Sequence, residues 1–110
     1  MCSSDLETCV RERLHFVTVV YNDSALSLID VAQRSRGYPT YGVRYGSVDF
    51  AAVAAGLGAW SRRVETPEAL EAAVKEGLGI DRPVVIDAVV DPAEYAAHHP
   101  RAREQAAENR

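Results

Sequence analysis

The fold is decided by two apolar runs, FVTVVY at positions 16–21 and VVIDAVV at positions 84–90. Both are rich in β-branched residues and lack the regular polar alternation of a half-exposed strand. Runs of this length and composition are typical of strands that are buried on both faces. A shorter strand candidate covers positions 59–64. Because such strands alternate with helical patterns, the sequence predicts an α/β fold, in part a three-layer α/β/α arrangement with a mostly parallel sheet.

Four segments carry apolar residues at helical spacing and predict amphipathic helices. Asp49 is expected to start the third of them and Gly58 to end it. The fourth has a strong start at Thr66-Pro67-Glu68, with a capping hydroxyl, a proline in the first turn and a carboxylate near the positive end of the helix dipole. The four predicted buried faces are Leu6, Cys9, Val10 and Leu14; Ala25, Leu28, Ile29 and Ala32; Phe50, Val53, Ala54 and Leu57; and Leu70, Ala73, Val74 and Leu78.

Composition restricts the class of protein. The chain has 110 residues, 47% of them hydrophobic and 25% charged, with a formal net charge of −4. This balance is that of a globular domain or part of one, and it argues against binding to nucleic acid or to anionic membranes. The longest apolar stretch, 50–60, is too short to span a bilayer, and the charged N-terminal residues do not resemble a signal peptide. We expect a cytoplasmic protein with one folded region over 1–92 and a polar, alanine-rich tail over 93–110.

Isolated reactive side chains do not form a recognisable site. Cys9 is expected to be a small buried hydrophobe, and the pair His98-His99 to be solvated, because adjacent helical residues point about 100° apart. Asp87 and Asp91, within and after the last strand, are expected to face solvent or a following turn. The segment 43–45 is expected to form at most a short strand within an irregular connection.

One tripeptide carries candidate chemistry. Asn22-Asp23-Ser24 follows the strand at 16–21, at the place where ligands bind in open α/β sheets. An asparagine oxygen and a backbone carbonyl are hard ligands that suit Mg²⁺, and the following helix start offers N–H groups to a diphosphate. The same residue types also form ordinary turns and helix caps, worth about 1 kcal/mol, which is the commoner explanation for such a tripeptide alone.

The wider sequence resembles thiamine-diphosphate enzymes of the acetolactate-synthase-like and 2-oxo-acid-decarboxylase kind. The stretch VVYNDSAL at 19–26 is similar to the end of their metal-diphosphate motif, usually Gly-Asp-Gly followed by a pair of asparagines. The resemblance extends in order from about residue 6 to residue 91. Its downstream parts are Asp49-Phe50, the alanine-rich helix to Gly58-Ala59, Arg63-Val64, TPEAL at 66–70 and RPVVID at 82–87.

This resemblance implies a Rossmann-like cofactor-binding fold, thiamine diphosphate and Mg²⁺ as cofactors, and a set of site residues. Asn22 matches the second asparagine, whose side chain ligates Mg²⁺, and Ser24 matches a residue whose main-chain oxygen is another ligand. Ala25 and Leu26 lie where the backbone meets the diphosphate. Tyr21 replaces the first asparagine, which should leave the metal ligand intact. Leu28 replaces a catalytic glutamate of pyruvate-decarboxylase-type members, which argues against that subclass.

The motif is incomplete within these residues. The sequence contains no Gly-Asp-Gly, so the aspartate that anchors Mg²⁺ would lie upstream, and the domain that binds the pyrimidine is also missing. We therefore expect the metal-diphosphate-holding part of an enzyme that decarboxylates or ligates 2-oxo acids, inactive alone and working in a homo-oligomer or with a complementary subunit. The alternative is a non-catalytic α/β module that pairs with a partner chain.

Overall fold

The computed structural model describes residues 3–93, which form parts of two compact units. Of the described residues, the first unit, called the sheet unit below, comprises 3–22 and 49–89. The second, called the α2 unit, comprises 23–48 and 90–93. The pair His98-His99 and the predicted tail beyond its first residue lie outside the described part of the chain.

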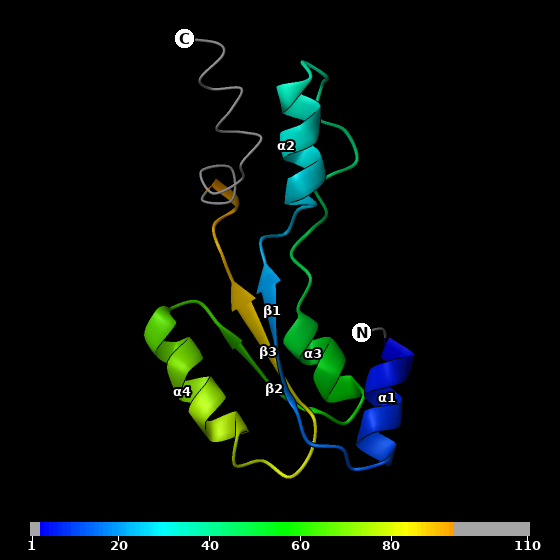
Figure 1. Ribbon diagram of the computed structural model, residues 1–110, viewed down its shortest axis with the longest axis vertical. Helices are drawn as coiled ribbons and strands as arrows, with labels where there is room; N and C mark the ends of the chain where they lie inside the picture. The colour runs from blue at the N-terminus through cyan, green and yellow to red at the C-terminus, as the bar shows by residue number, and fades with distance from the viewer. Residues whose placement is uncertain (1–2, 94–110) are drawn as a thin grey trace. The chain divides into compact units, whose positions relative to one another are not determined.

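A parallel sheet is the centre of the sheet unit, and it confirms the predicted α/β class. Its strands are β1 (Val17–Asn22), β2 (Trp60–Val64) and β3 (Val84–Val89), in the spatial order β1-β3-β2 (Figure 1). Each lies within one residue of the segment that the sequence predicts. Because β3 is hydrogen-bonded on both sides, its backbone is enclosed, as its apolar run indicates.

Helices cover both faces of this sheet, which gives the unit its three layers (Figure 1). Successive residues of β3 point alternately to the two faces of the sheet. Val84, Ile86 and Ala88 share an apolar cluster with Ala73, whereas Val85 packs in a second cluster on the opposite face. The covering helices are α4 (Pro67–Gly77) on the first face, and α1 (Ser3–Arg11) and α3 (Phe50–Gly56) on the second.

The predicted helix boundaries are confirmed where a local signal sets them. Asp49 caps α3, its side chain accepting a bond of 2.8 Å from the backbone N–H of Ala52. Thr66 caps α4 in the same way, accepting from Ala69 at 3.2 Å. Gly58 follows α3 with φ of +92°. These ends depend on neighbours in sequence, so they are readable without the tertiary structure.

The predicted buried faces of α3 and α4 are each wrong at one residue. Leu78 is 62% exposed because α4 ends at Gly77, which takes the buried place against Val84 instead. Val53 is 52% exposed, and α3 buries its small residues Ala51 and Ala54.

The first helix also departs from its predicted face. Leu6 and Val10 pack as expected. Leu14 lies beyond the end of α1 and is half exposed, and Cys9 is only partly buried.

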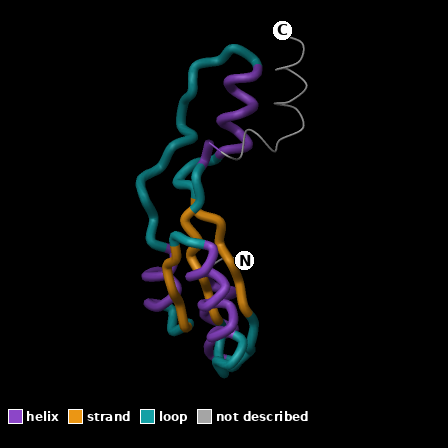
Figure 2. The backbone as a smooth tube through the Cα atoms, turned by 90° about the vertical axis from the view of Figure 1, so that its left-hand side faces the viewer, coloured by secondary structure: helices purple, strands orange, loops and turns teal. Residues whose placement is uncertain are grey.

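The α2 unit contains helix α2 (Ser27–Ser35) followed by a long loop (Figure 2). The helix begins two residues later than predicted and buries a different face. Its buried side chains are Ser27 and Asp30, whereas Leu28 and Ile29 remain about half exposed. The expected strand at 43–45 is reduced to an isolated antiparallel bridge between Ala25 and Arg44.

Candidate functional site

A buried carboxylate lies on the central strand of the sheet unit. Asp87 of β3 is fully enclosed, with a relative exposure of 0%. The expectation that it faces solvent is wrong, because β3 is covered on both faces and has no exposed side. Asp91, beyond the strand, is exposed as expected and accepts the Ala93 N–H at 2.8 Å.

Three donors from three elements surround the Asp87 carboxylate. Asn22, the last residue of β1, donates its Nδ2 to Oδ1 at 2.9 Å. Arg63 of β2 donates its Nη1 to Oδ2 at 2.9 Å. The backbone N–H of Phe50, the first residue of α3, donates to the same Oδ2 at 3.1 Å.

Strand register explains why these groups meet. Val20 of β1 and Arg63 of β2 are both direct neighbours of Asp87 in the parallel ladders. Asn22 is two residues beyond Val20 and therefore emerges on the same face. That face is the one that α3 covers, so the N-terminus of α3 supplies the third donor.

The cluster satisfies a charge that would otherwise destabilise the fold. A buried carboxylate without partners costs several kcal/mol, so buried charges occur where they are paired and hydrogen-bonded. Arg63 provides the counter-charge, and its side chain is 28% exposed, so the ion pair reaches the surface on one side only. The N-terminus of α3 adds the favourable end of a helix dipole.

Asn22, the principal predicted site residue, is thus held in a defined orientation. It is 2% exposed and lies at the carboxyl end of β1. The sequence singled out this residue as a candidate ligand, but it did not predict the contacts with Asp87, Arg63 and Phe50. An aspartate inside an apolar strand run and an arginine inside another strand candidate were the available signals, since both charges needed partners.

The other predicted site residues, Ser24, Ala25 and Leu26, belong to the α2 unit. Ser24 has φ of +57°, a left-handed conformation that is uncommon for residues other than glycine. Its main-chain oxygen accepts the N–H of Tyr45 at 3.3 Å. The predicted ligand atom is therefore part of a tight turn against the segment at 43–45.

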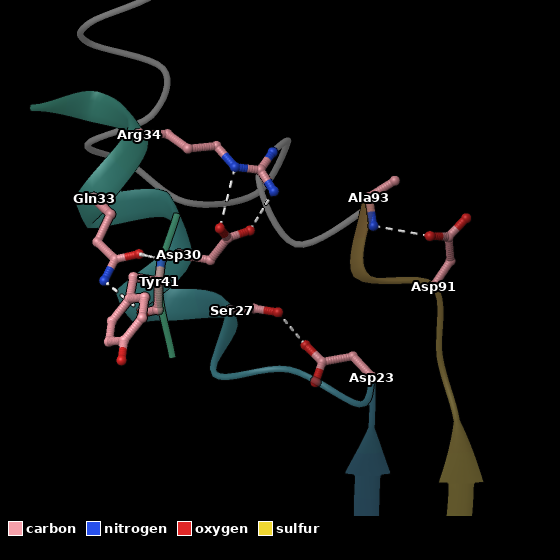
Figure 3. Close-up of polar contacts among 8 residues, drawn as sticks. All are labelled: Asp23, Ser27, Asp30, Gln33, Arg34, Tyr41, Asp91 and Ala93. Atoms are coloured by element: carbon pink, nitrogen blue, oxygen red, sulfur yellow. Dashed lines mark hydrogen bonds and ion pairs between the residues drawn. The ribbon is translucent and has the colours of Figure 1, made fainter. Parts of the chain in front are cut away.

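The backbone N–H groups of Ala25 and Leu26 are both engaged within the α2 unit. The first donates to Asp23 Oδ1 at 3.0 Å, and the second donates to the main-chain oxygen of Val43 at 2.7 Å. Asp23 also accepts the Ser27 hydroxyl through its other carboxylate oxygen (Figure 3). Either amide would have to exchange its present bond in order to bind a diphosphate.

Further polar contacts organise the α2 helix and its loop (Figure 3). Arg34 pairs with Asp30 one turn earlier, with Nε donating to Oδ1 at 3.2 Å. The Gln33 amide forms two hydrogen bonds with the Tyr41 backbone. Nε2 donates to the main-chain oxygen and Oε1 accepts from the N–H, each at 3.0 Å. These bonds fix the loop after α2 to the helix.

A pocket of about 320 Å³ lies within the α2 unit. Its lining includes Asp30, Arg34, Arg44 and Asp91, so charges of both signs border it. Two of them, Asp30 and Arg34, already neutralise each other. The pocket does not contain the predicted residues Ser24, Ala25 or Leu26.

The donor chemistry for a metal ion is limited in the described residues. Within residues 3–93, no three His, Cys, Asp or Glu side chains are grouped so that they could hold a metal ion. The predicted ligand atoms, Asn22 Oδ1 and the Ser24 main-chain oxygen, are neutral oxygens of the type that Mg²⁺ accepts. No helix in this same range is long and apolar enough to cross a membrane.

Comparison with known proteins extends these observations. Residues 1–88 match the family model described as "Thiamine pyrophosphate enzyme, C-terminal TPP binding domain". An acetolactate synthase of Bacillus subtilis (strain 168) is 34% identical over 87 residues, which are 79% of this chain and 15% of that protein. A catabolic acetolactate synthase of Raoultella terrigena is 30% identical over 89 residues, 81% of this chain and 16% of that protein.

The chain therefore corresponds to a small part of the length of these relatives, and the matched part contains the Asn22 cluster. The ordered motifs, the parallel α/β sheet and the family match agree with one another. This chain belongs to the C-terminal thiamine-diphosphate-binding domains of acetolactate-synthase-like enzymes.

Proposed function

We propose that this chain holds the Mg²⁺-diphosphate end of thiamine diphosphate in an enzyme that decarboxylates or ligates 2-oxo acids. The observation that carries the proposal is the placement of Asn22. It belongs to the matched region, ends β1, and has its amide nitrogen bonded to the buried Asp87. Side chains at the carboxyl ends of parallel strands are where ligands of such folds bind.

In this proposal Asn22 Oδ1 and the main-chain oxygen of Ser24 ligate Mg²⁺. A carbonyl oxygen has two lone pairs, so the bond that Ser24 accepts from Tyr45 does not by itself exclude a cation. The backbone at Ala25 and Leu26 contacts the diphosphate after exchanging its internal bonds. Thiamine diphosphate, when bound, supplies the electron sink for breaking or forming a bond beside a 2-oxo-acid carbonyl.

The proposal also includes inactivity of these residues alone. Both assigned ligands are neutral, and Mg²⁺ usually takes at least one carboxylate in addition to phosphate oxygens and water. The sequence contains no Gly-Asp-Gly that would supply it. A complete site then needs a carboxylate and a pyrimidine-binding surface from residues outside these 110, either in a longer chain or in a complementary subunit.

Calorimetric titration with thiamine diphosphate, with and without Mg²⁺, tests this proposal. The 110-residue chain alone is expected to show no metal-dependent binding. The chain extended by an upstream segment carrying Gly-Asp-Gly is expected to bind only with Mg²⁺, and Asn22→Ala to abolish that binding. Tyr21→Ala is the matched control, because this neighbouring side chain is 72% exposed. Retained binding in Asn22→Ala would overturn the assignment of Asn22.

The second candidate is a non-catalytic module that pairs with a partner chain. The exposed apolar side chains of the α2 unit favour it, because neighbouring Leu26, Leu28 and Ile29 are 46%, 53% and 49% exposed. Clustered apolar exposure is typical of interaction surfaces. A folded chain that forms a stable complex through this face, and that binds no cofactor even with the Gly-Asp-Gly extension, would favour the module over the enzyme.

A further inference from the structure

The Asp87 carboxylate determines which end of the buried Asn22 amide faces it. An asparagine amide has two branches that differ in chemistry, since Nδ2 only donates and Oδ1 only accepts hydrogen bonds. Asp87 Oδ1 accepts from Nδ2 at 2.9 Å. The opposite amide orientation would place two oxygens in contact in a buried environment, so the hydrogen bond to the carboxylate selects the observed one.

The Asp87 carboxylate is itself held in one orientation, so it can fix the orientation of Asn22. Its second oxygen is committed to Arg63 and to the backbone of Phe50, at 2.9 and 3.1 Å. The carboxylate therefore cannot turn without breaking two bonds from other elements. Groups that orient a ligating side chain in this way strongly influence metal affinity.

We propose that Asp87 is a positioning residue, which directs the Asn22 Nδ2 to its own carboxylate and so turns Oδ1, the branch that would ligate Mg²⁺, away from Asp87. The metal part of this inference rests on the proposed function. The orientation part does not, because it concerns two side chains of the described structure. The competing view is that Asp87 only anchors Arg63 and α3.

Substitutions at Asp87 and Asn22 distinguish the positioning role from a role in anchoring Arg63 and α3 only. In Asp87→Asn, the single amide oxygen is needed by the two donors Arg63 and Phe50, so the new amide nitrogen faces Asn22. Asn22 then turns its own Oδ1 inward in order to accept. In the double variant Asn22→Asp/Asp87→Asn, the bond between the two positions is restored in the reverse direction, and a carboxylate oxygen takes the place of Asn22 Oδ1.

The deciding measurement is hydrogen exchange of the side-chain amide groups by NMR, on the 110-residue chain without metal or cofactor. In the parent, the Asn22 NH₂ protons are expected to be protected. In Asp87→Asn they should exchange about tenfold faster, and the amide at position 87 should become the protected one. The double variant should keep that protected amide at position 87.

Ser61→Ala is the matched control. Its hydroxyl also bonds β2 to α3, donating to the main-chain oxygen of Ala51 at 2.7 Å, but it does not bond Asn22. If loosening of α3 were the cause, this variant would accelerate Asn22 exchange as well. Unchanged protection of Asn22 in a folded Asp87→Asn chain would overturn the proposal. If Asp87→Asn does not fold, recovery of the fold in the double variant supports the pairing, and failure to recover overturns it.

Titration of the Gly-Asp-Gly-extended chain with thiamine diphosphate and Mg²⁺ then distinguishes the two levels of the argument. Absence of binding in the parent, with the NMR result as expected, would refute the proposed function and leave the orientation intact. Binding in the parent that Asp87→Asn weakens at least about tenfold, and that the double variant recovers, supports both. Equal binding in parent and Asp87→Asn would overturn the positioning role alone.

Discussion

Two adjacent arginines on β2 provide a test of how burial controls the value of an ion pair. Arg62 bonds Glu76 at 2.6 Å, and Arg63 bonds Asp87 at 2.9 Å. The first pair is about half exposed on both sides, at 44% and 46%, whereas Asp87 is fully buried. If distance alone set the strength of an ion pair, the Arg62 pair would contribute more to the free energy of unfolding. If burial sets it, the Arg63 pair contributes more.

We predict that Arg63→Met lowers the free energy of unfolding far more than Arg62→Met. Methionine keeps an apolar stem but removes the charge and the donors. Loss of Arg63 leaves the buried carboxylate with two neutral donors, which for a fully buried pair costs about 3–5 kcal/mol. Since Arg63 is 28% exposed, water replaces part of that interaction, and about 2–4 kcal/mol is expected.

The loss for Arg62→Met should be about 1 kcal/mol. Exposed ion pairs contribute about 0.2–1 kcal/mol, and the contact of the Arg62 guanidinium with the Trp60 ring, at 5.0 Å, adds a similar amount at most. Urea unfolding followed by circular dichroism measures both variants. With a slope of about 2 kcal/mol per molar urea, the Arg63 variant should shift the midpoint by roughly 1–2 M. Equal losses, or a larger loss for Arg62, would refute the reasoning from burial.

Substitutions at three further positions test the helix boundaries, each by thermal unfolding against the parent. Gly58→Ala should lower the free energy of unfolding by about 1–3 kcal/mol, because φ is +92° and the new Cβ would lie 2.9 Å from Val10 Cγ1. An unchanged unfolding midpoint would contradict this close approach. Thr66→Ala should cost about 1 kcal/mol through loss of the cap on Ala69, and Thr66→Ser should restore it. Leu78→Ala should cost no more than about 0.5 kcal/mol at this 62% exposed position, and a core-sized loss would show that the side chain is buried in solution.

Local signals in the sequence predicted most of the sheet unit. The caps at Asp49 and Thr66 and the stop at Gly58 act on neighbouring backbone groups, so they operate wherever the segment lies. The apolar runs of β1 and β3 likewise indicate burial on both faces. The α2 unit was predicted less well, because its apolar residues Leu28 and Ile29 do not form its buried face.

The candidate site likewise has a part that the sequence indicates and a part that only the tertiary structure decides. Asn22 could be identified from the sequence, since a polar turn after a buried strand is a local pattern and its motif resembles a known family. The burial of Asp87 could not, because it depends on which strand lies at the centre of the sheet and on the helix that covers that face. Its partners Arg63 and Phe50 are 24 and 37 residues away in sequence.

The sequence by itself therefore determined the secondary-structure types, the α/β class and the position of the motif, because these follow from periodicity and from contacts between near neighbours. The tertiary structure alone decided that Asp87 is enclosed and that its carboxylate bonds the last residue of β1, Arg63 near the end of β2 and the first residue of α3. The physical reason is that strand order and register bring distant residues together, and the cost of an unpaired buried charge then dictates which of them bond.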